Sequence, residues 1–175
     1  MSDGGADTGP ASGPESGPEP GGGMLDDTTA GVVAPPPLIF AGAIALGLVA
    51  EWVWPTMLHT GASSFGVLLL AAGLAIAVMT VPRFRRARTP VDPFHATRAL
   101  IITGPFRFSR NPLYLSLALV HLGLGLMIGS LWVLIMALPA IAVMQWGVIS
   151  REERYLEGRF GEDYRAYKGR VRRWL

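Results

Sequence analysis

The sequence predicts an all-α integral membrane protein with about four transmembrane helices in two hairpins, followed by a C-terminal cytoplasmic amphipathic helix. Three observations support this fold class. Half of the 175 residues are apolar and only 16% are charged, long uncharged runs alternate with dense basic segments, and all 15 Lys and Arg residues follow position 82. A chain of this length without cysteine is expected to fold as one unit without disulfides.

The first 33 residues differ in composition from the rest of the chain. They contain six Asp and Glu residues, no Lys or Arg, and many Gly, Pro and Ser residues. Such a segment cannot bury enough apolar surface to offset the entropy lost on ordering. We therefore expect a disordered acidic tail over residues 1–33 and one membrane domain over residues 34–175.

Four apolar runs carry the membrane prediction, and we expect transmembrane helices at about 37–54, 64–82, 112–128 and 131–149. A helix needs about 20 residues to cross a hydrocarbon core of roughly 30 Å, and these runs have that length or are slightly shorter. The uncharged sequence HTGASS joins the first two runs, and Gly129 and Ser130 alone join the last two. Short connections of this kind predict two helical hairpins.

The basic residues predict the orientation. Seven lie between Arg83 and Arg110 and eight between Arg151 and Arg173. Because cytoplasmic flanks of membrane helices are enriched in Lys and Arg, both blocks are expected on the cytoplasmic side of the inner membrane. Four crossings then place both termini in the cytoplasm and both short turns outside. Clustering of charge between apolar runs argues against nucleic-acid binding, despite a net charge of +2.

Polar residues gather in two cytoplasmic segments that flank the second hairpin. The first, residues 95–114, contains a predicted turn at Gly104-Pro105, and Asn111 is a plausible N-cap for a helix that begins at Pro112. A helix N-terminus beside Arg107 and Arg110 can bind an anion, although these arginines could equally hold lipid headgroups. Tyr114 could anchor the interface or face a ligand.

The second segment, residues 151–175, begins with the acid pair Glu152-Glu153 directly after the fourth apolar run. A carboxylate here could bind an ammonium group while an arginine binds a carboxylate, which fits a zwitterionic amino-acid ligand. The alternative is that Glu152, Glu153 and Glu157 pair with neighbouring arginines along one helix.

An amphipathic stretch follows, in which large apolar residues recur every three or four positions among basic ones. They are Phe160, Tyr164, Tyr167, Val171 and Trp174. This spacing predicts a helix lying on the bilayer surface.

Other polar residues within the apolar runs give weaker signals. Glu51 is a carboxylate inside a run, and its neighbours Trp52 and Trp54 place it near the outer interface, where we expect it to be hydrated. The three histidines are dispersed along the chain, so no metal site is expected.

At the two polar segments the sequence resembles the superfamily of isoprenylcysteine carboxyl methyltransferases and phospholipid methyltransferases. The matching text is LIITGPFRFSRNPLYLS, from residue 100, and EERYLEGRFGEDYRAYKGRVRRWL, from residue 152. Both lie within roughly the last 80 residues of the chain. The resemblance implies a membrane enzyme that uses S-adenosyl-L-methionine to methylate a lipidic or membrane-partitioning acceptor.

Carried over by position, the resemblance implies that nine residues bind this cofactor: Leu100, Ile101, Gly104, Arg110, Asn111, Pro112, Tyr114, Glu152 and Glu153. The isoprenylcysteine branch usually has His where this chain has Asn111, and an arginine near the position of Val148. Both departures disfavour a prenylcysteine acceptor. The competing hypothesis is a small membrane module or transporter without catalytic activity, suggested by the short hairpins.

Overall fold

A computed structural model describes residues 31–56, 58, 63–90 and 97–175. These residues form helices without any strand. The elements in chain order are α1 (Pro36–Val53), α2 (Ser63–Arg86), the 3-10 helix η1 (Gly104–Arg107), α3 (Pro112–Ile128), α4 (Leu131–Val143), the π-helix η2 (Met144–Ile149) and α5 (Ser150–Lys168). The all-helical prediction is confirmed for this part of the chain.

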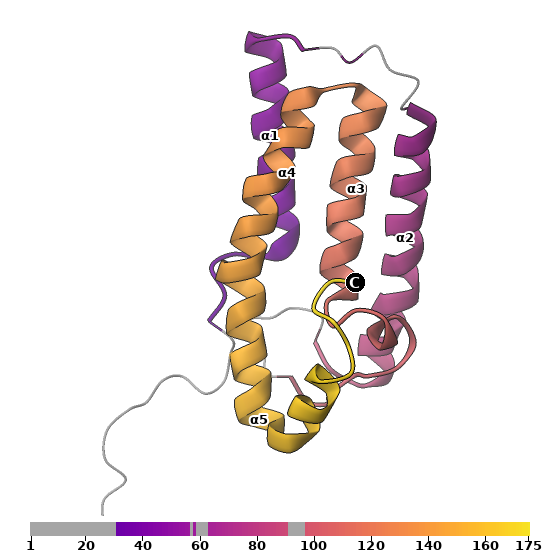
Figure 1. Cartoon of the computed structure of the whole chain (residues 1–175), viewed down its shortest axis with the longest axis vertical. Coiled ribbons are helices and arrows are strands. Elements are labelled where there is room, and N and C mark those ends of the chain that lie inside the picture. The colour runs from indigo at the N-terminus through magenta and orange to yellow at the C-terminus, as the bar shows by residue number, and fades with distance from the viewer. Residues whose placement is uncertain (1–30, 57, 59–62, 91–96) are drawn as a thin grey trace, which may run out of the picture.

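The four long apolar helices form a bundle in which α3 and α4 occupy the centre (Figure 1). α2 packs along α3 and α1 packs along α4, whereas α1 and α2 do not pack along each other. The expected first hairpin therefore has its two helices on opposite sides of the second hairpin. α4, η2 and α5 continue as one helical rod that extends beyond the bundle.

Glycines set the closeness of these helix pairs. A Cβ atom on Gly123 of α3 would lie 2.7 Å from the backbone nitrogen of Leu70 and 2.8 Å from the carbonyl oxygen of Gly66, both in α2. A Cβ on Gly47 of α1 would lie 2.7 Å from the Cα of Val133 in α4. Small residues at membrane helix contacts allow backbones to approach closely. Close approach at these glycines accounts for the packing of α1 against α4 and of α2 against α3.

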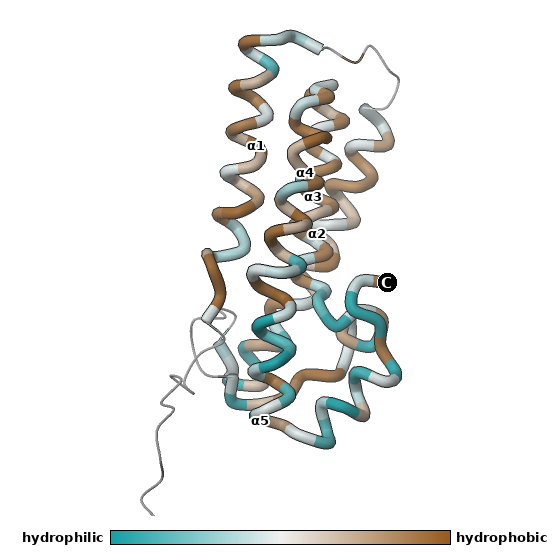
Figure 2. Tube along the Cα trace, turned by 60° about the vertical axis from the view of Figure 1, so that its left-hand side comes forward, coloured by the Kyte–Doolittle hydropathy of each residue, from teal (hydrophilic) through white to brown (hydrophobic). Residues whose placement is uncertain are grey.

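The apolar surface of the bundle fits a membrane. Three helices are long and apolar enough to cross one, namely α1, α2 and the rod that begins at Leu131, and α3 is a shorter apolar helix of 17 residues. Hydrophobic residues run along the bundle, whereas hydrophilic residues gather around α5 (Figure 2). We call this α5 end the polar end of the bundle.

Helix boundaries follow the apolar runs with two differences. α2 continues through Pro82 to Arg86, where three arginines in its last turn complement the helix dipole. The fourth run is α-helical only to Val143 and π-helical from Met144 to Ile149. Short π-helical insertions occur frequently at functional sites, and this one directly precedes the segment that contains Glu152 and Glu153.

Glu51 joins α1 to the turn between α3 and α4. Its carboxylate accepts hydrogen bonds from the Thr56 backbone nitrogen at 2.5 Å, the Thr56 hydroxyl at 2.7 Å and the Ser130 hydroxyl at 2.6 Å. The residue is buried. The expectation of a hydrated Glu51 is therefore wrong, because the N-cap residue of α4 and the chain after α1 supply the hydrogen bonds that water would have supplied.

The chain before α1 contacts the rod. Residues 1–30 of the expected acidic tail lie outside the described residues. The backbone nitrogen of Val33 donates to the carbonyl of Gly147 at 3.3 Å, Arg151 donates to the carbonyl of Gly31 at 2.8 Å, and Val32 is buried in the main core cluster. Residues 31–33 therefore belong to the folded part of the chain.

The C-terminal segment departs from the expected surface helix. α5 bends at Gly161, whose φ of 50° is readily available to glycine, and it ends at Lys168. Tyr164 and Tyr167 are buried, and Val171 and Trp174 lie beyond the helix. The helix that the three- and four-residue spacing predicts is present at Tyr164 and Tyr167. These two side chains, however, face the protein interior.

Replacing Gly123 by Ala should loosen the α2–α3 contact, because the added methyl group meets backbone atoms that cannot rotate away. We expect the variant to lose about 1–3 kcal/mol of stability, measured by thermal unfolding in detergent. Gly158→Ala is the matched control, since its Cβ would meet nothing within 4 Å. Equal unfolding midpoints for the two variants would contradict the proposed close packing.

Candidate functional site

The predicted site residues converge at the polar end of the bundle. Eight of the nine line one cavity of about 80 Å³ between α3, α5 and the chain that precedes η1. We call it the inner cavity. These eight residues are Leu100, Ile101, Arg110, Asn111, Pro112, Tyr114, Glu152 and Glu153.

Glu152 supplies a carboxylate to the inner cavity. It accepts a hydrogen bond from the Tyr114 hydroxyl at 3.0 Å, and it forms no salt bridge within the described parts of the chain. Burial raises its pKa to about 7; the charge of Glu153 acts in the same direction, and the Tyr114 hydrogen bond opposes both. A carboxyl group with this pKa is poised to ionise when a cation arrives.

Glu153, although adjacent, has a different environment. One carboxylate oxygen lies 3.1 Å from Arg110 Nη1, and Arg173 donates to both oxygens, at 3.0 and 2.5 Å. Glu153 is buried, and its partner Arg110 is largely buried, whereas the Arg173 side chain is partly exposed. Two arginines thus pair with Glu153, whereas none of the salt bridges among the described residues involves Glu152.

The last seven residues, 169–175, form a segment that we call the C-terminal strap. The carbonyl of Arg172 accepts from the Arg110 backbone nitrogen at 3.0 Å, and the carbonyl of Arg173 accepts from the Asn111 side chain at 2.9 Å. Trp174 donates to the side chain of Gln145 in η2 at 3.0 Å. The strap thereby ties the start of α3 to the rod.

Asn111 occupies the N-cap position of α3, as expected, but its side chain makes no capping hydrogen bond. It contacts the strap instead. The sequence analysis did not predict the contacts of Arg173 and the strap, because the basic C-terminal segment was expected to lie on the bilayer surface. The spacing of Tyr164 and Tyr167 gave a usable signal, but it did not indicate which side they face.

Tyr164 and Tyr167 line the inner cavity. Burial raises the pKa of Tyr164 to about 12 and raises that of Tyr167 still further. The Tyr167 hydroxyl donates to the carbonyl of Phe106 at 2.7 Å. Both phenols therefore stay protonated at neutral pH and act as hydrogen-bonding groups rather than bases.

Arg110 contributes a guanidinium to the inner cavity. Its Nη1 contacts Glu153. Its Nε is buried and has no hydrogen-bond partner among the described residues. A buried guanidinium N–H without a partner is costly, so this atom is a candidate donor to a ligand's carboxylate or other acceptor.

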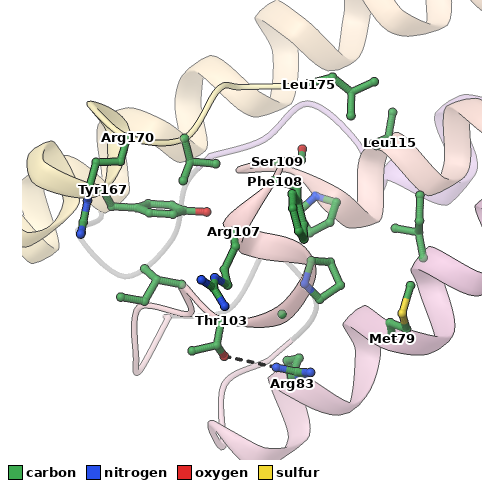
Figure 3. Close-up of a pocket in the computed structure, with 16 residues that line it drawn as sticks. Met79, Arg83, Thr103, Arg107, Phe108, Ser109, Leu115, Tyr167, Arg170 and Leu175 are labelled. Atoms are coloured by element: carbon green, nitrogen blue, oxygen red, sulfur yellow. Dashed lines mark hydrogen bonds between the residues drawn. The ribbon is translucent and has the colours of Figure 1, made fainter.

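Gly104, the ninth predicted residue, lies elsewhere. It lines a larger cavity of about 1070 Å³ between α2, η1, α3 and the strap, and Figure 3 shows this cavity. The guanidinium of Arg83 packs over Gly104: a Cβ there would lie 2.6 Å from Arg83 Cζ, and the φ of 65° also favours glycine. We call this second space the arginine-lined cavity.

No cluster of three or more potential metal ligands occurs within the described ranges. His121 is buried in the bundle, with its Nε2 2.8 Å from the carbonyl oxygen of Val133. Val148 is fully buried in the core, so its side chain offers nothing to a ligand carboxylate.

Comparison with known proteins places the site in a family. The model of the phospholipid methyltransferase family matches residues 62–163, which is more than half of the chain. The chain belongs to the phospholipid methyltransferase family. The matched region runs from α2 through most of α5 and includes all nine predicted site residues.

The phospholipid methyltransferase family is a family of membrane methyltransferases, so membership and the apolar helices together indicate a membrane-bound methyltransferase. The chain is also 44% identical over 63 residues to an uncharacterized protein of Haemophilus influenzae; the match covers 36% of this chain and all of that protein. No solved structure matches the chain. Arg173 lies outside the matched residues, whereas its partner Glu153 lies within them.

Substituting Arg173 tests the strap. Arg173→Ala removes both hydrogen bonds to Glu153 and should release residues 169–175 from Ser109–Asn111, at a cost of about 1–3 kcal/mol. Hydrogen exchange should then accelerate at the backbone nitrogen of Arg110. Arg172→Ala is the control, since that side chain is exposed. Unchanged protection of Arg110 in Arg173→Ala would contradict the role of this ion pair.

Proposed function

We propose that the protein transfers a methyl group from S-adenosylmethionine to a lipidic or membrane-partitioning acceptor at the cytoplasmic face of the inner membrane. The observation that carries this proposal is the pairing of charges in the inner cavity. Among the described residues, Glu152 offers a carboxylate without a cationic partner, and Arg110 offers a buried N–H without an acceptor. Both lie within the region matched by the methyltransferase family.

The charges of the inner cavity fit the amino-acid end of this cofactor. We infer that Glu152 receives the ammonium group and that Arg110 donates to the carboxylate, helped by the positive N-terminus of α3 at Pro112. Leu100 and Ile101 would form an apolar wall of the inner cavity. Glu153, saturated by Arg110 and Arg173, would hold Arg110 in place without contacting the cofactor.

The inner cavity is smaller than the roughly 300–1,000 Å³ of typical small-molecule sites. Binding therefore requires its walls to separate. The inner cavity would accommodate one end of the cofactor. We infer that the rest of the cofactor extends past Thr89 and Ala99, which also line the cavity. Hydrogen bonds from the Arg98 and Ala99 backbone nitrogens to the Thr89 hydroxyl hold this wall.

The chemistry asks mainly for positioning. The bound cofactor would supply a methyl group on a cationic sulfur, and the protein would hold the acceptor in line with it and exclude water. The phenols of Tyr164 and Tyr167 remain protonated, because their pKa values are raised. An acceptor that is already nucleophilic needs no protein base.

The membrane topology belongs to the same proposal. Four crossings by α1, α2, α3 and the α4–η2 part of the rod would place the polar end in the cytoplasm, because all 15 Lys and Arg residues follow position 82. Asn111 and the buried Val148 both disfavour a prenylcysteine acceptor. The remaining acceptor classes are the amine of a phospholipid, a carboxylate, a thiol and a phenol.

Calorimetric titration with S-adenosylmethionine tests the site. We expect saturable binding that weakens about tenfold or more in Glu152→Gln and Arg110→Ala, since each variant removes a charged hydrogen-bonding partner. Glu162→Gln and Arg86→Ala are matched controls on exposed side chains. Absence of binding at millimolar cofactor would refute the activity and favour a non-catalytic membrane module. Equal effects in all four variants would refute the site alone.

The raised pKa of Glu152 predicts a pH dependence of the same binding constant. Below about pH 7 the carboxyl group is largely protonated and cannot attract an ammonium group. Affinity should therefore increase roughly eightfold between pH 6 and pH 7.5, and binding should release about one proton at pH 6 and only about a quarter of a proton at pH 7.5. Glu152→Gln should remove this dependence. An unchanged slope in that variant would show that another group titrates.

A further inference from the structure

The second half of α5 and the C-terminal strap fold back against the inner cavity. After the bend at Gly161 the chain turns round, and the C-terminus lies beside the start of α3 (Figure 1). Tyr164 and Tyr167, in this returning segment, line the inner cavity. We call residues 162–175 the C-terminal lid. Because the cavity beneath it measures only about 80 Å³, a ligand can enter only if one of its walls moves.

Gly161 gives the C-terminal lid a hinge. Its backbone has a φ of 50° and a ψ of −121°, a combination that glycine adopts far more readily than any other residue. A Cβ at this position would meet nothing within 4 Å, so no neighbouring side chain obstructs rotation here. Across the bend, Lys168 Nζ lies 3.2 Å from a carboxylate oxygen of Glu157, and both side chains are partly exposed. Such a pair contributes little to stability, so other contacts hold the lid.

The end of the lid is latched by polar contacts. Arg173 donates two hydrogen bonds to Glu153, the Tyr167 hydroxyl donates to a carbonyl of η1, and Trp174 donates to a side chain of η2. The Arg173 side chain is 31% exposed, so water can replace Glu153 as its partner. Glu153 itself keeps its ion pair with Arg110 when Arg173 leaves. The latch can therefore open without leaving a buried acid unpaired.

Movement of the lid changes the wall between the two cavities. Tyr167 belongs to the lid, and together with Pro112 it lines both the inner cavity and the arginine-lined cavity. Withdrawal of Tyr167 would connect the inner cavity with the larger space of about 1070 Å³. Opening thus supplies the room that the closed inner cavity lacks.

We propose that residues 162–175 form a lid, hinged at Gly161 and latched by Arg173 on Glu153, that opens to admit a ligand to the inner cavity and closes over it. Closure also fixes Arg110, because its backbone nitrogen donates to the carbonyl of Arg172 in the lid. The same movement would therefore exclude water and orient a binding residue. That the ligand is S-adenosylmethionine rests on the proposed function, whereas opening of the lid does not.

The reactivity of a thiol placed under the lid tests the proposal on the full chain in detergent. Ser109 is 2% exposed, and its hydroxyl donates to the carbonyl of Arg173 at 3.4 Å. The chain has no cysteine, so Ser109→Cys introduces a single thiol. Its rate of reaction with a water-soluble thiol reagent measures how often the lid opens. Adding Arg173→Gln should raise this rate about tenfold or more, because it breaks charged hydrogen bonds.

The hinge is tested in the same way. Gly161→Ala should raise the rate about fivefold or more, because the closed bend strains a residue that has a Cβ. Gly158→Ala, in the same helix, and Arg172→Gln, on an exposed side chain, are the matched controls. Faster reaction in both test variants and in neither control supports the lid. An unchanged rate in either test variant, or equal increases in test and control variants, overturns it.

Cofactor addition separates this proposal from the proposed function. The variant rates are measured without cofactor, so they test the lid whether or not the cofactor binds. S-adenosylmethionine at roughly ten times its dissociation constant should slow the reaction of the Ser109→Cys chain about tenfold, because the bound cofactor holds the lid closed. Calorimetric binding that leaves this rate unchanged would overturn the lid's role at the site. Absence of calorimetric binding would refute the proposed function alone.

Discussion

The polar end of the molecule depends on one buried carboxylate. Glu153 binds Arg110 from the loop before α3 and Arg173 from the C-terminal strap, so a single side chain joins three segments that are distant in sequence. Removing either arginine would leave a buried acid incompletely paired, which is costly in a low-dielectric environment. The adjacent Glu152 lines the inner cavity, because Glu153 forms the ion pairs with Arg110 and Arg173.

The bundle below this cluster provides a stable frame. Glycines bring α2 against α3 and α1 against α4, and Glu51 fastens the opposite end by accepting hydrogen bonds from Thr56 and Ser130. The rod then extends α4 through the π-helical η2 into α5 and presents the acid pair to the loop before α3. Two cavities on either side of Pro112 and Tyr167 follow from this arrangement.

Much of this arrangement was accessible from the sequence, and the reasons for the remainder are physical. The apolar runs predicted the positions of the helices closely, including the start of α3 at Pro112, because desolvation and turn chemistry act locally. Local patterns do not specify pairing, so the separation of α1 from α2 could not be predicted, nor could the partners of Glu51. The C-terminus was misinterpreted because arginines that pair with a buried acid and arginines that face lipid have the same spacing. Eight of the nine residues that the family resemblance implies line one cavity, whereas the ninth, Gly104, packs against Arg83.

In the proposed function, Glu152 and Arg110 build a cofactor site from which a methyl group reaches a membrane-partitioning acceptor. The most direct measurement incubates membranes containing the chain with methyl-labelled S-adenosylmethionine and identifies labelled molecules by mass spectrometry. We expect a labelled lipid-soluble product that is absent with Glu152→Gln and present with Glu162→Gln. An absence of label with the unmodified chain, or equal labelling with both variants, would contradict it.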